Sequence, residues 1–130
     1  MCATIEIDKV SAVLGLEFED KSLLVRALTH TSYAAEHGQD RALSNERLEF
    51  LGDAILKAVM AEQLMTLMED ADEGRLSKVS AQAVSGQALA RAAVDLGVSD
   101  FIMLGHGEES SGGRCRQRNL AGAMEAIIGA

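Results

Sequence analysis

Apolar side chains recur along this chain at steps of three to five residues, the spacing that gathers them on one face of an α-helix. The longest such pattern follows Ser44, a residue type favoured at helix N-caps, and runs from residue 47 to about residue 68. A second pattern spans residues 76–96 and stops at Gly97, which predicts a helix that ends in a glycine. Nowhere does the sequence alternate apolar and polar residues as a strand would. We therefore predict an all-α fold.

Shorter patterns complete the predicted helical domain. Residues 5–14 favour a short helix, and Asp20 is placed to cap a following one. Residues 37–40 and the glycine-rich stretch 105–113 are typical of loops. The last helical pattern begins near Asn119 and has no stop signal before Ala130, so we expect the natural chain to continue. The length fits one domain, residues 1–130, whose C-terminal part we expect to be cut short.

The charge balance narrows the possible functions. Acidic residues number 20 against 12 basic ones, and the net charge of −8 excludes a nucleic-acid binder that works through positive charge over its whole surface. Aromatic residues make up 3% of the chain, too few for a platform that stacks bases. Two cysteines and no apolar run of membrane-spanning length predict a protein of the reducing cytoplasm without a membrane partner.

Three acidic residues share one face of the longest predicted helix. Glu46, Glu49 and Asp53 stand at positions i, i+3 and i+7, and most such runs are simply solvated faces. Gly52 argues for more, because a glycine inside a helix costs about 1 kcal/mol relative to alanine and permits close approach by another segment. We expect the opposite face to anchor the helix in the core through three apolar residues, Leu48, Leu51 and Ile55.

Carboxylates on a rigid helix suit a hard divalent cation such as Mg²⁺ or Mn²⁺. Such an ion activates water and neutralises phosphate charge. A further acid on another helix is needed to close the site, and Glu125 is the only acidic residue after Glu109. It lies among small residues that allow its helix to pack close to a neighbour, although a lone glutamate on a helix is more often a surface residue.

The segment 45–54, Asn-Glu-Arg-Leu-Glu-Phe-Leu-Gly-Asp-Ala, resembles the signature motif of the ribonuclease III family residue for residue. Further blocks that resemble the family follow in the family's order, with His106 where a lysine is usual. They lie within residues 18–33, 73–77, 104–114 and 120–130. The resemblance implies an all-helical endonuclease domain that acts as a homodimer on double-stranded RNA with Mg²⁺, for which Mn²⁺ can substitute. It also implies a role in RNA processing, for example of ribosomal RNA precursors.

The resemblance also assigns roles by position. The metal and catalytic residues would be Glu49, Asp53 and Glu125, and Phe50 would insert into a pocket on the dimer partner. The cleft that holds RNA would include two further acids, Glu46 and Glu73. Arg114 and Arg116 belong to a basic run that is either a solvated cluster or a set of phosphate contacts in that cleft.

One departure from the family pattern concerns catalysis. The family has an aspartate where this chain has Gly122, so one carboxylate of the metal cluster is absent. We expect reduced but not abolished activity, because a water molecule can take the place of one Mg²⁺ ligand. The alternatives are a ribonuclease III-like protein that binds structured RNA or a ribonucleoprotein without cutting it, and an engineered chain in which Gly122 suppresses cleavage. The family's double-stranded-RNA-binding domain is also absent from these 130 residues.

Overall fold

Helices are the only secondary-structure elements longer than one residue among the described residues. The computed structural model describes the backbone of residues 2–130 and the side chains from residue 7 onward. Within that range the only β-type pairing is an isolated parallel bridge between Thr29 and Met103. The all-α prediction is therefore confirmed. No helix in the described residues is both long enough and apolar enough to cross a membrane.

The order of the elements follows the predicted sequence pattern with some differences. The α-helices are α1 (Cys2–Leu14), α2 (Lys21–Leu28), α3 (Thr31–Glu36), α4 (Glu46–Leu67), α5 (Glu73–Ala83), α6 (Gly86–Asp95), α7 (His106–Ser110) and α8 (Gln117–Gly129). Short 3₁₀ turns lie between them, namely η1 (Arg41–Leu43), η2 (Val98–Phe101) and η3 (Gly113–Cys115).

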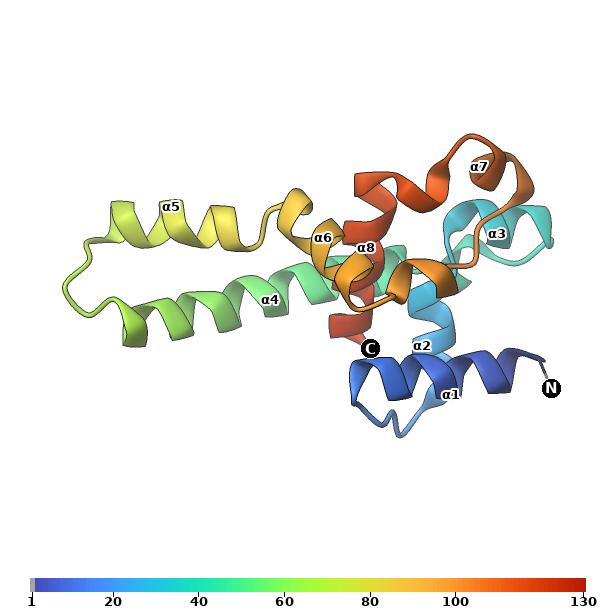
Figure 1. Cartoon of the computed structure of the whole chain (residues 1–130), viewed down its shortest axis with the longest axis horizontal. Helices are drawn as coiled ribbons and strands as arrows, with labels where there is room; N and C mark the ends of the chain where they lie inside the picture. Colours follow the sequence, from blue (N-terminus) through green and yellow to red (C-terminus); the bar gives the residue numbers. More distant parts are fainter. Residues whose placement is uncertain (1) are drawn as a thin grey trace.

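Helix α8 forms the centre of the core. It packs against α4, α6 and α2, and Figure 1 shows it crossing the N-terminal half of α4. Small residues dominate its buried surface, among them Ala121, Ala123 and Ala126, so neighbouring helices can approach closely. Leu24 and Leu28 of α2 and Val98 of η2 are fully buried and complete the core. The site residues on α8 are thus held by the most deeply packed helix of the domain.

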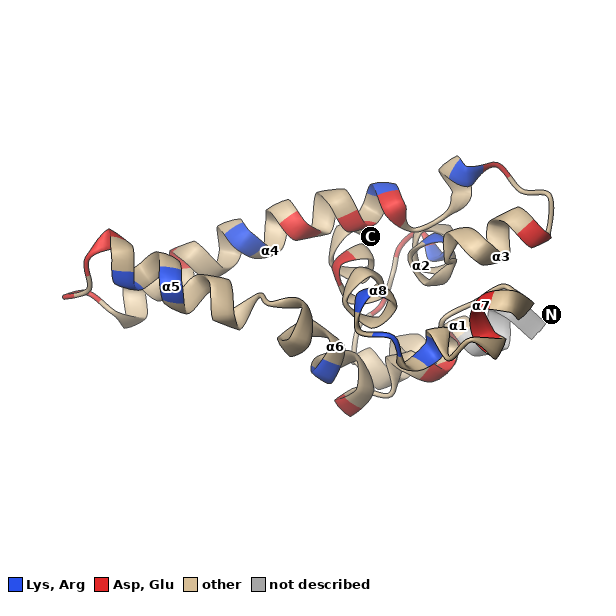
Figure 2. Cartoon of the chain, turned by 90° about the horizontal axis from the view of Figure 1, so that it is seen from above, with Lys and Arg blue, Asp and Glu red and all other residues tan. Residues whose placement is uncertain are grey.

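The C-terminal half of α4 and helix α5 form an arm that extends away from this core. Figures 1 and 2 both show the two helices side by side, joined by the acidic turn that follows α4. Leu64 is buried between them, whereas Met65 and Leu67 are 67% and 75% exposed. Asp72 caps α5 by accepting a hydrogen bond from the amide of Arg75 at 2.9 Å. The arm holds few buried residues of its own, and its apolar side chains are largely open.

Several local predictions need correction. The helix predicted over residues 76–96 is two helices, because the chain breaks at Val84 and the Ser85 side chain caps α6. The predicted loop 105–113 contains the short helix α7. Ser44 is not the N-cap of α4, which is Asn45, and the Ser44 hydroxyl is buried without a partner. The prediction that Gly97 ends the second helical pattern is confirmed, because Gly97 follows the C-cap of α6 and has a left-handed backbone with φ 75°.

The expected core face of α4 is also only partly correct. Leu48 is buried as predicted, but Leu51 is 47% exposed and Ile55 is 39% exposed. Val59, one turn further along, is half exposed as well. These side chains continue the apolar pattern of the helix without packing into the core of this chain. The apolar periodicity of α4 therefore indicates two apolar surfaces on this helix, one buried in the core and one exposed to solvent.

Candidate functional site

The site begins with a close crossing of α4 and α8. A Cβ atom added to Gly52 would lie 1.6 Å from the carbonyl oxygen of Glu125. A Cβ on Gly129 would lie 2.3 Å from the carbonyl oxygen of Leu48. Because no side chain other than hydrogen fits at these contacts, the two backbones touch. The prediction that Gly52 permits close approach is confirmed, and the approaching residue is Glu125.

This crossing brings together the three carboxylates that the sequence singled out, here named the acidic cluster: Glu49 and Asp53 on α4 and Glu125 on α8. Burial raises the pKa of Glu49, and the charges of Glu46 and Asp53 raise it further. Burial also raises the pKa of Glu125, with added contributions from Asp53 and Glu49. Glu125 therefore experiences the charges of Glu49 and Asp53 across the helix interface. A cation beside carboxyl groups held together in this way would favour their ionised forms.

Gly122 borders the same cluster. A Cβ at this position would lie 2.7 Å from Oε2 of Glu49, which means that the Glu49 carboxylate occupies the space of the missing side chain. The obstruction is the end of a flexible side chain rather than backbone. An aspartate here could be accommodated if Glu49 rotated aside, and it would then add a fourth carboxylate to the cluster.

Basic residues are interleaved with the acids. Lys57 Nζ donates a hydrogen bond to Asp53 Oδ2 at 2.7 Å. Arg118, in the first turn of α8, acts on Glu49 through its charge and lowers its pKa, against the larger effect of burial. Arg41 makes a two-pronged contact with Glu46, both bonds at 2.8 Å, and this hydrogen bonding lowers the pKa of Glu46. Figure 2 shows that α4 carries both acidic and basic residues along its length.

The chemistry of these residues fits a divalent cation, although the ligand set is not closed in the structure. No three His, Cys, Asp or Glu side chains among the described residues already stand close enough together to hold an ion. Asp53 is instead engaged by the Lys57 ammonium, a positive charge at the edge of the cluster. The three carboxylates supply oxygen ligands of the kind that Mg²⁺ and Mn²⁺ prefer.

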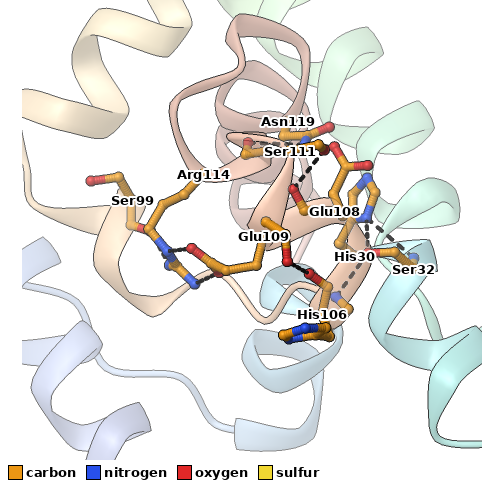
Figure 3. A network of polar contacts seen from close by, with 12 residues as sticks. His30, Ser32, Ser99, His106, Glu108, Glu109, Ser111, Arg114 and Asn119 are labelled. Atoms are coloured by element: carbon orange, nitrogen blue, oxygen red, sulfur yellow. Dashed lines mark hydrogen bonds and ion pairs between the residues drawn. The ribbon is translucent and has the colours of Figure 1, made fainter.

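The loop before α8 is fixed by a polar network, shown in Figure 3. Glu109 binds the Arg114 guanidinium, which also donates to the carbonyl of Ser99 at 2.7 Å. Glu108 accepts from Arg116 and, at 2.8 Å, from the buried amide of Asn119. This network sets the position at which α8 begins. Because Arg114 and Arg116 both have internal carboxylate partners, their contact with RNA stays a prediction.

Glu73 lies apart from the acidic cluster, in the first turn of α5. It accepts a hydrogen bond from the Ser77 hydroxyl at 2.9 Å. Glu73 and Lys57 line the same groove between α4 and α5, with a volume of about 460 Å³. The structure thus places Glu73 on the arm, across a groove from the helix that carries Asp53. No contact within the described residues joins it to the cluster.

Phe50 projects from the acidic helix into solvent and is 82% exposed, an unusual state for a phenyl ring. Beside it lies a hollow of about 590 Å³, lined by Phe50 itself and by neighbouring residues of α2 and α4: Arg26, Glu46, Arg47, Leu48 and Leu51. A protruding ring next to a hollow is a self-complementary arrangement, of the kind that a two-fold interface requires.

Reasoning from the sequence did not connect Lys57 or Arg118 with the acidic cluster. Lys57 stands four residues after Asp53, and an acid followed by a base at that spacing is a recognised helical pair, so a signal existed. The effect of Arg118 depends on the way α8 crosses α4, and no local pattern reveals it. Glu108 and Asn119, which position the start of α8, were also missed because their contacts span a turn whose path the sequence does not show.

Comparison with known proteins assigns the family. A sequence model described as Ribonuclease-III-like matches residues 20–130, so the chain belongs to the ribonuclease-III-like family. It is 49% identical over 117 residues to Ribonuclease 3 of Caldanaerobacter subterraneus, which covers 90% of this chain and 51% of that protein. It is 48% identical over 124 residues to Ribonuclease 3 of Pseudomonas aeruginosa, covering 95% of this chain and 51% of the relative. The chain spans about half the length of these relatives.

Solved structures agree with this assignment. The nuclease domain of ribonuclease III from Campylobacter jejuni superimposes with a TM-score of 0.87 at 42% identity, over 95% of this chain and 82% of that one. A second structure of the same domain gives a TM-score of 0.84. The first of these structures is described as flexible in a region involved in dimer formation. The fold is therefore that of a ribonuclease III nuclease domain.

Proposed function

We propose that this chain is the nuclease domain of a divalent-metal-dependent endoribonuclease that cleaves double-stranded RNA as a homodimer. The observation that carries the proposal is the crossing of α4 and α8, which places Glu125 against Glu49 and Asp53. Membership of the family and the match to a nuclease domain support the same activity. The reaction would belong to RNA processing in the cytoplasm, with ribosomal RNA precursors as one class of substrate.

The acidic cluster would hold Mg²⁺, or Mn²⁺ in its place. When bound, such an ion supplies an activated water and stabilises the charge that develops on the phosphate. Glu49 and Glu125 contribute oxygens from half-buried positions on two packed helices, so their carboxylates have limited freedom. Asp53 contributes an oxygen once it leaves Lys57. Preorganised groups of this kind do not need to reorganise during the reaction, which is the main source of electrostatic catalysis.

The acidic charge of the chain is compatible with an RNA substrate. Recognition of double-stranded RNA relies on phosphate and 2′-hydroxyl contacts and on shape. Metal ions in the cleft offset local repulsion, and Arg118 supplies positive charge beside Glu49. Glu46 and Glu73 would border the RNA path, with Arg114 and Arg116 nearby as contacts to phosphates. The isolated domain would bind RNA weakly, with a modest dependence on salt.

The dimer would be built on Phe50. By two-fold symmetry, the ring of each protomer would enter the hollow beside Phe50 of its partner. The open residues Leu51, Ile55 and Val59 continue the apolar surface along α4 and would be covered in the same interface. An acidic cluster from each protomer would then face the bound duplex, one for each strand.

A second function is favoured by Gly122. A ribonuclease III-like protein that binds structured RNA without cutting it could lack one carboxylate, and Glu49 fills the vacated space in this chain. The cluster nevertheless keeps three acids, and in two of them, Glu49 and Glu125, burial and neighbouring carboxylates raise the pKa. We therefore favour an active enzyme with a higher metal requirement.

Cleavage of labelled double-stranded RNA tests the proposal. The full chain is incubated with a duplex and with Mg²⁺ or Mn²⁺, and the products are sized and their ends analysed. We expect discrete staggered products from the unmodified chain and none from Glu125→Gln. Glu62→Gln, an exposed change on α4 outside the site, is the matched control and should cleave normally. Binding without cleavage in every metal would favour the second function.

A further inference from the structure

A positive charge that has no role in the proposed function, the Lys57 ammonium, lies beside the acidic cluster. Lys57 lies one helical turn after Asp53 on α4 and binds its Oδ2 at 2.7 Å. The same ammonium acts on Glu125 of α8, where its charge lowers the carboxyl pKa against the opposing effect of burial. Lys57 therefore faces carboxylates from both of the helices whose crossing forms the site.

An ammonium and a divalent cation compete for the same carboxylate oxygens. The lysine side chain has only donors and no acceptor, so it cannot become a metal ligand in the charged form. At contact distance it also repels a second cation. The Lys57–Asp53 pair is partly open to solvent, with side-chain exposures of 59% and 38%, and such pairs break and re-form readily. Binding of a metal at Asp53 Oδ2 then requires Lys57 to leave, and binding at Oδ1 brings the metal close to the Lys57 charge.

We infer that Lys57 is an internal counter-cation of the acidic cluster, a positioning residue that holds Asp53 away from the metal and sets the metal concentration at which the site fills. This inference rests on the proposed function, because the site concerned is its metal site. Its effect is greater in this chain than it would be beside a fourth carboxylate, because Gly122 leaves only three in the cluster. Two neighbouring cations, Lys57 and Arg118, offset much of that charge.

Direct measurement of metal binding tests the inference without reference to activity. Mn²⁺ is titrated into the full chain and free Mn²⁺ is followed by electron paramagnetic resonance, at low and at high salt. Lys57→Gln removes the charge and keeps a polar side chain, and we expect its dissociation constant for Mn²⁺ to fall about two- to fivefold, the upper part of the range of an exposed ion pair. This gain should shrink at high salt, which screens such pairs. Lys57→Arg, which keeps the charge, should bind as weakly as the unmodified chain.

Lys9→Gln is the matched control, because it makes the same change in net charge on exposed α1, away from the site. An affinity for Lys57→Gln equal to that of the unmodified chain would overturn the inference and leave the proposed function intact. An equal gain from Lys9→Gln would overturn it too, since the effect would then be general. Absence of Mn²⁺ binding in every variant at millimolar concentration would overturn both the inference and the metal-dependent function.

Discussion

Replacing Gly52 with alanine should destabilise the domain, against the usual trend for helices. In an open helix this change gains about 1 kcal/mol, because alanine is the better helix former. Here the new Cβ would lie 1.6 Å from the carbonyl oxygen of Glu125, which is backbone and cannot rotate away. An ordinary contact needs about 3.5 Å, so α4 and α8 would have to separate by about 2 Å. The clash with the Glu125 carbonyl therefore outweighs the gain in helix propensity, and the substitution lowers the free energy of unfolding.

The size of the effect follows from where the separation occurs. Overpacking a core costs about 1–3 kcal/mol, and shifting α8 also loosens its contacts with α6 and α2. We expect a steric cost near 3 kcal/mol and, after the gain of about 1 kcal/mol in helix propensity, a net loss near 2 kcal/mol, a large share of the 5–15 kcal/mol that typically stabilises a domain. With a urea slope of about 1.5 kcal/mol per molar, the unfolding midpoint would fall by about 1.3 M.

Urea unfolding followed by circular dichroism measures this loss. Gly74→Ala is the control, because a Cβ there meets nothing closer than Asp72 Oδ1 at 3.6 Å, an ordinary contact. It should leave the midpoint unchanged or raise it slightly. If Gly52→Ala were as stable as the unmodified chain, the backbone contact that builds the site would be refuted. Weaker Mn²⁺ binding should accompany the loss of stability, since Glu125 moves with α8.

Three further predictions concern the dimer, the missing carboxylate and the effect of pH. Phe50→Ala removes one buried ring per protomer at about 2 kcal/mol each, so dimer dissociation should rise about a thousandfold, and an unchanged dimer in sedimentation would exclude the proposed interface. Gly122→Asp should lower the Mg²⁺ concentration needed for cleavage and lower the thermal midpoint in EDTA, because a fourth carboxylate adds repulsion that only a cation relieves. Glu125→Gln should raise that midpoint in EDTA near neutral pH and lose the advantage in acid. The sign follows because a carboxyl whose folded pKa is raised stabilises the fold when protonated, and this contribution is lost as pH rises through the raised value. A midpoint difference independent of pH would contradict the raised pKa, and Glu62→Gln is the exposed control.

The helices and the main contact of the site could be predicted from the sequence. Helical periodicity located α4, and the glycine inside it correctly indicated a close approach. The break before α6 did leave a signal in the sequence, because Ser85-Gly86 is a dipeptide typical of turns, and the prediction of one helix over residues 76–96 did not use it. The helix stops there because the Ser85 hydroxyl accepts from the amide of Ala88, a local bond that competes with helix continuation.

The open face of α4 shows a different limit. An apolar stripe facing a partner protomer has the same sequence pattern as one facing the core, so periodicity could not separate Leu51 and Ile55 from Leu48. Only the packing of α8 distinguishes them, because it covers one side of α4 and leaves the other bare. Lys57 illustrates the same point for charge. Its spacing from Asp53 was visible in the sequence, but its effect on Glu125 depends on the crossing of two helices.

The glycine contacts and the charges of the site act on the same pair of helices. Gly52 and Gly129 allow α4 and α8 to touch, and this contact holds Glu125 near Glu49 and Asp53. The packing energy of the crossing thus opposes the repulsion among the acids, and the metal-free fold keeps that repulsion as an unfavourable charge energy. A cation that binds only the folded cluster relieves it, so metal affinity and fold stability must be linked. It follows that substitutions that weaken the crossing reduce metal affinity even where they leave every carboxylate in place.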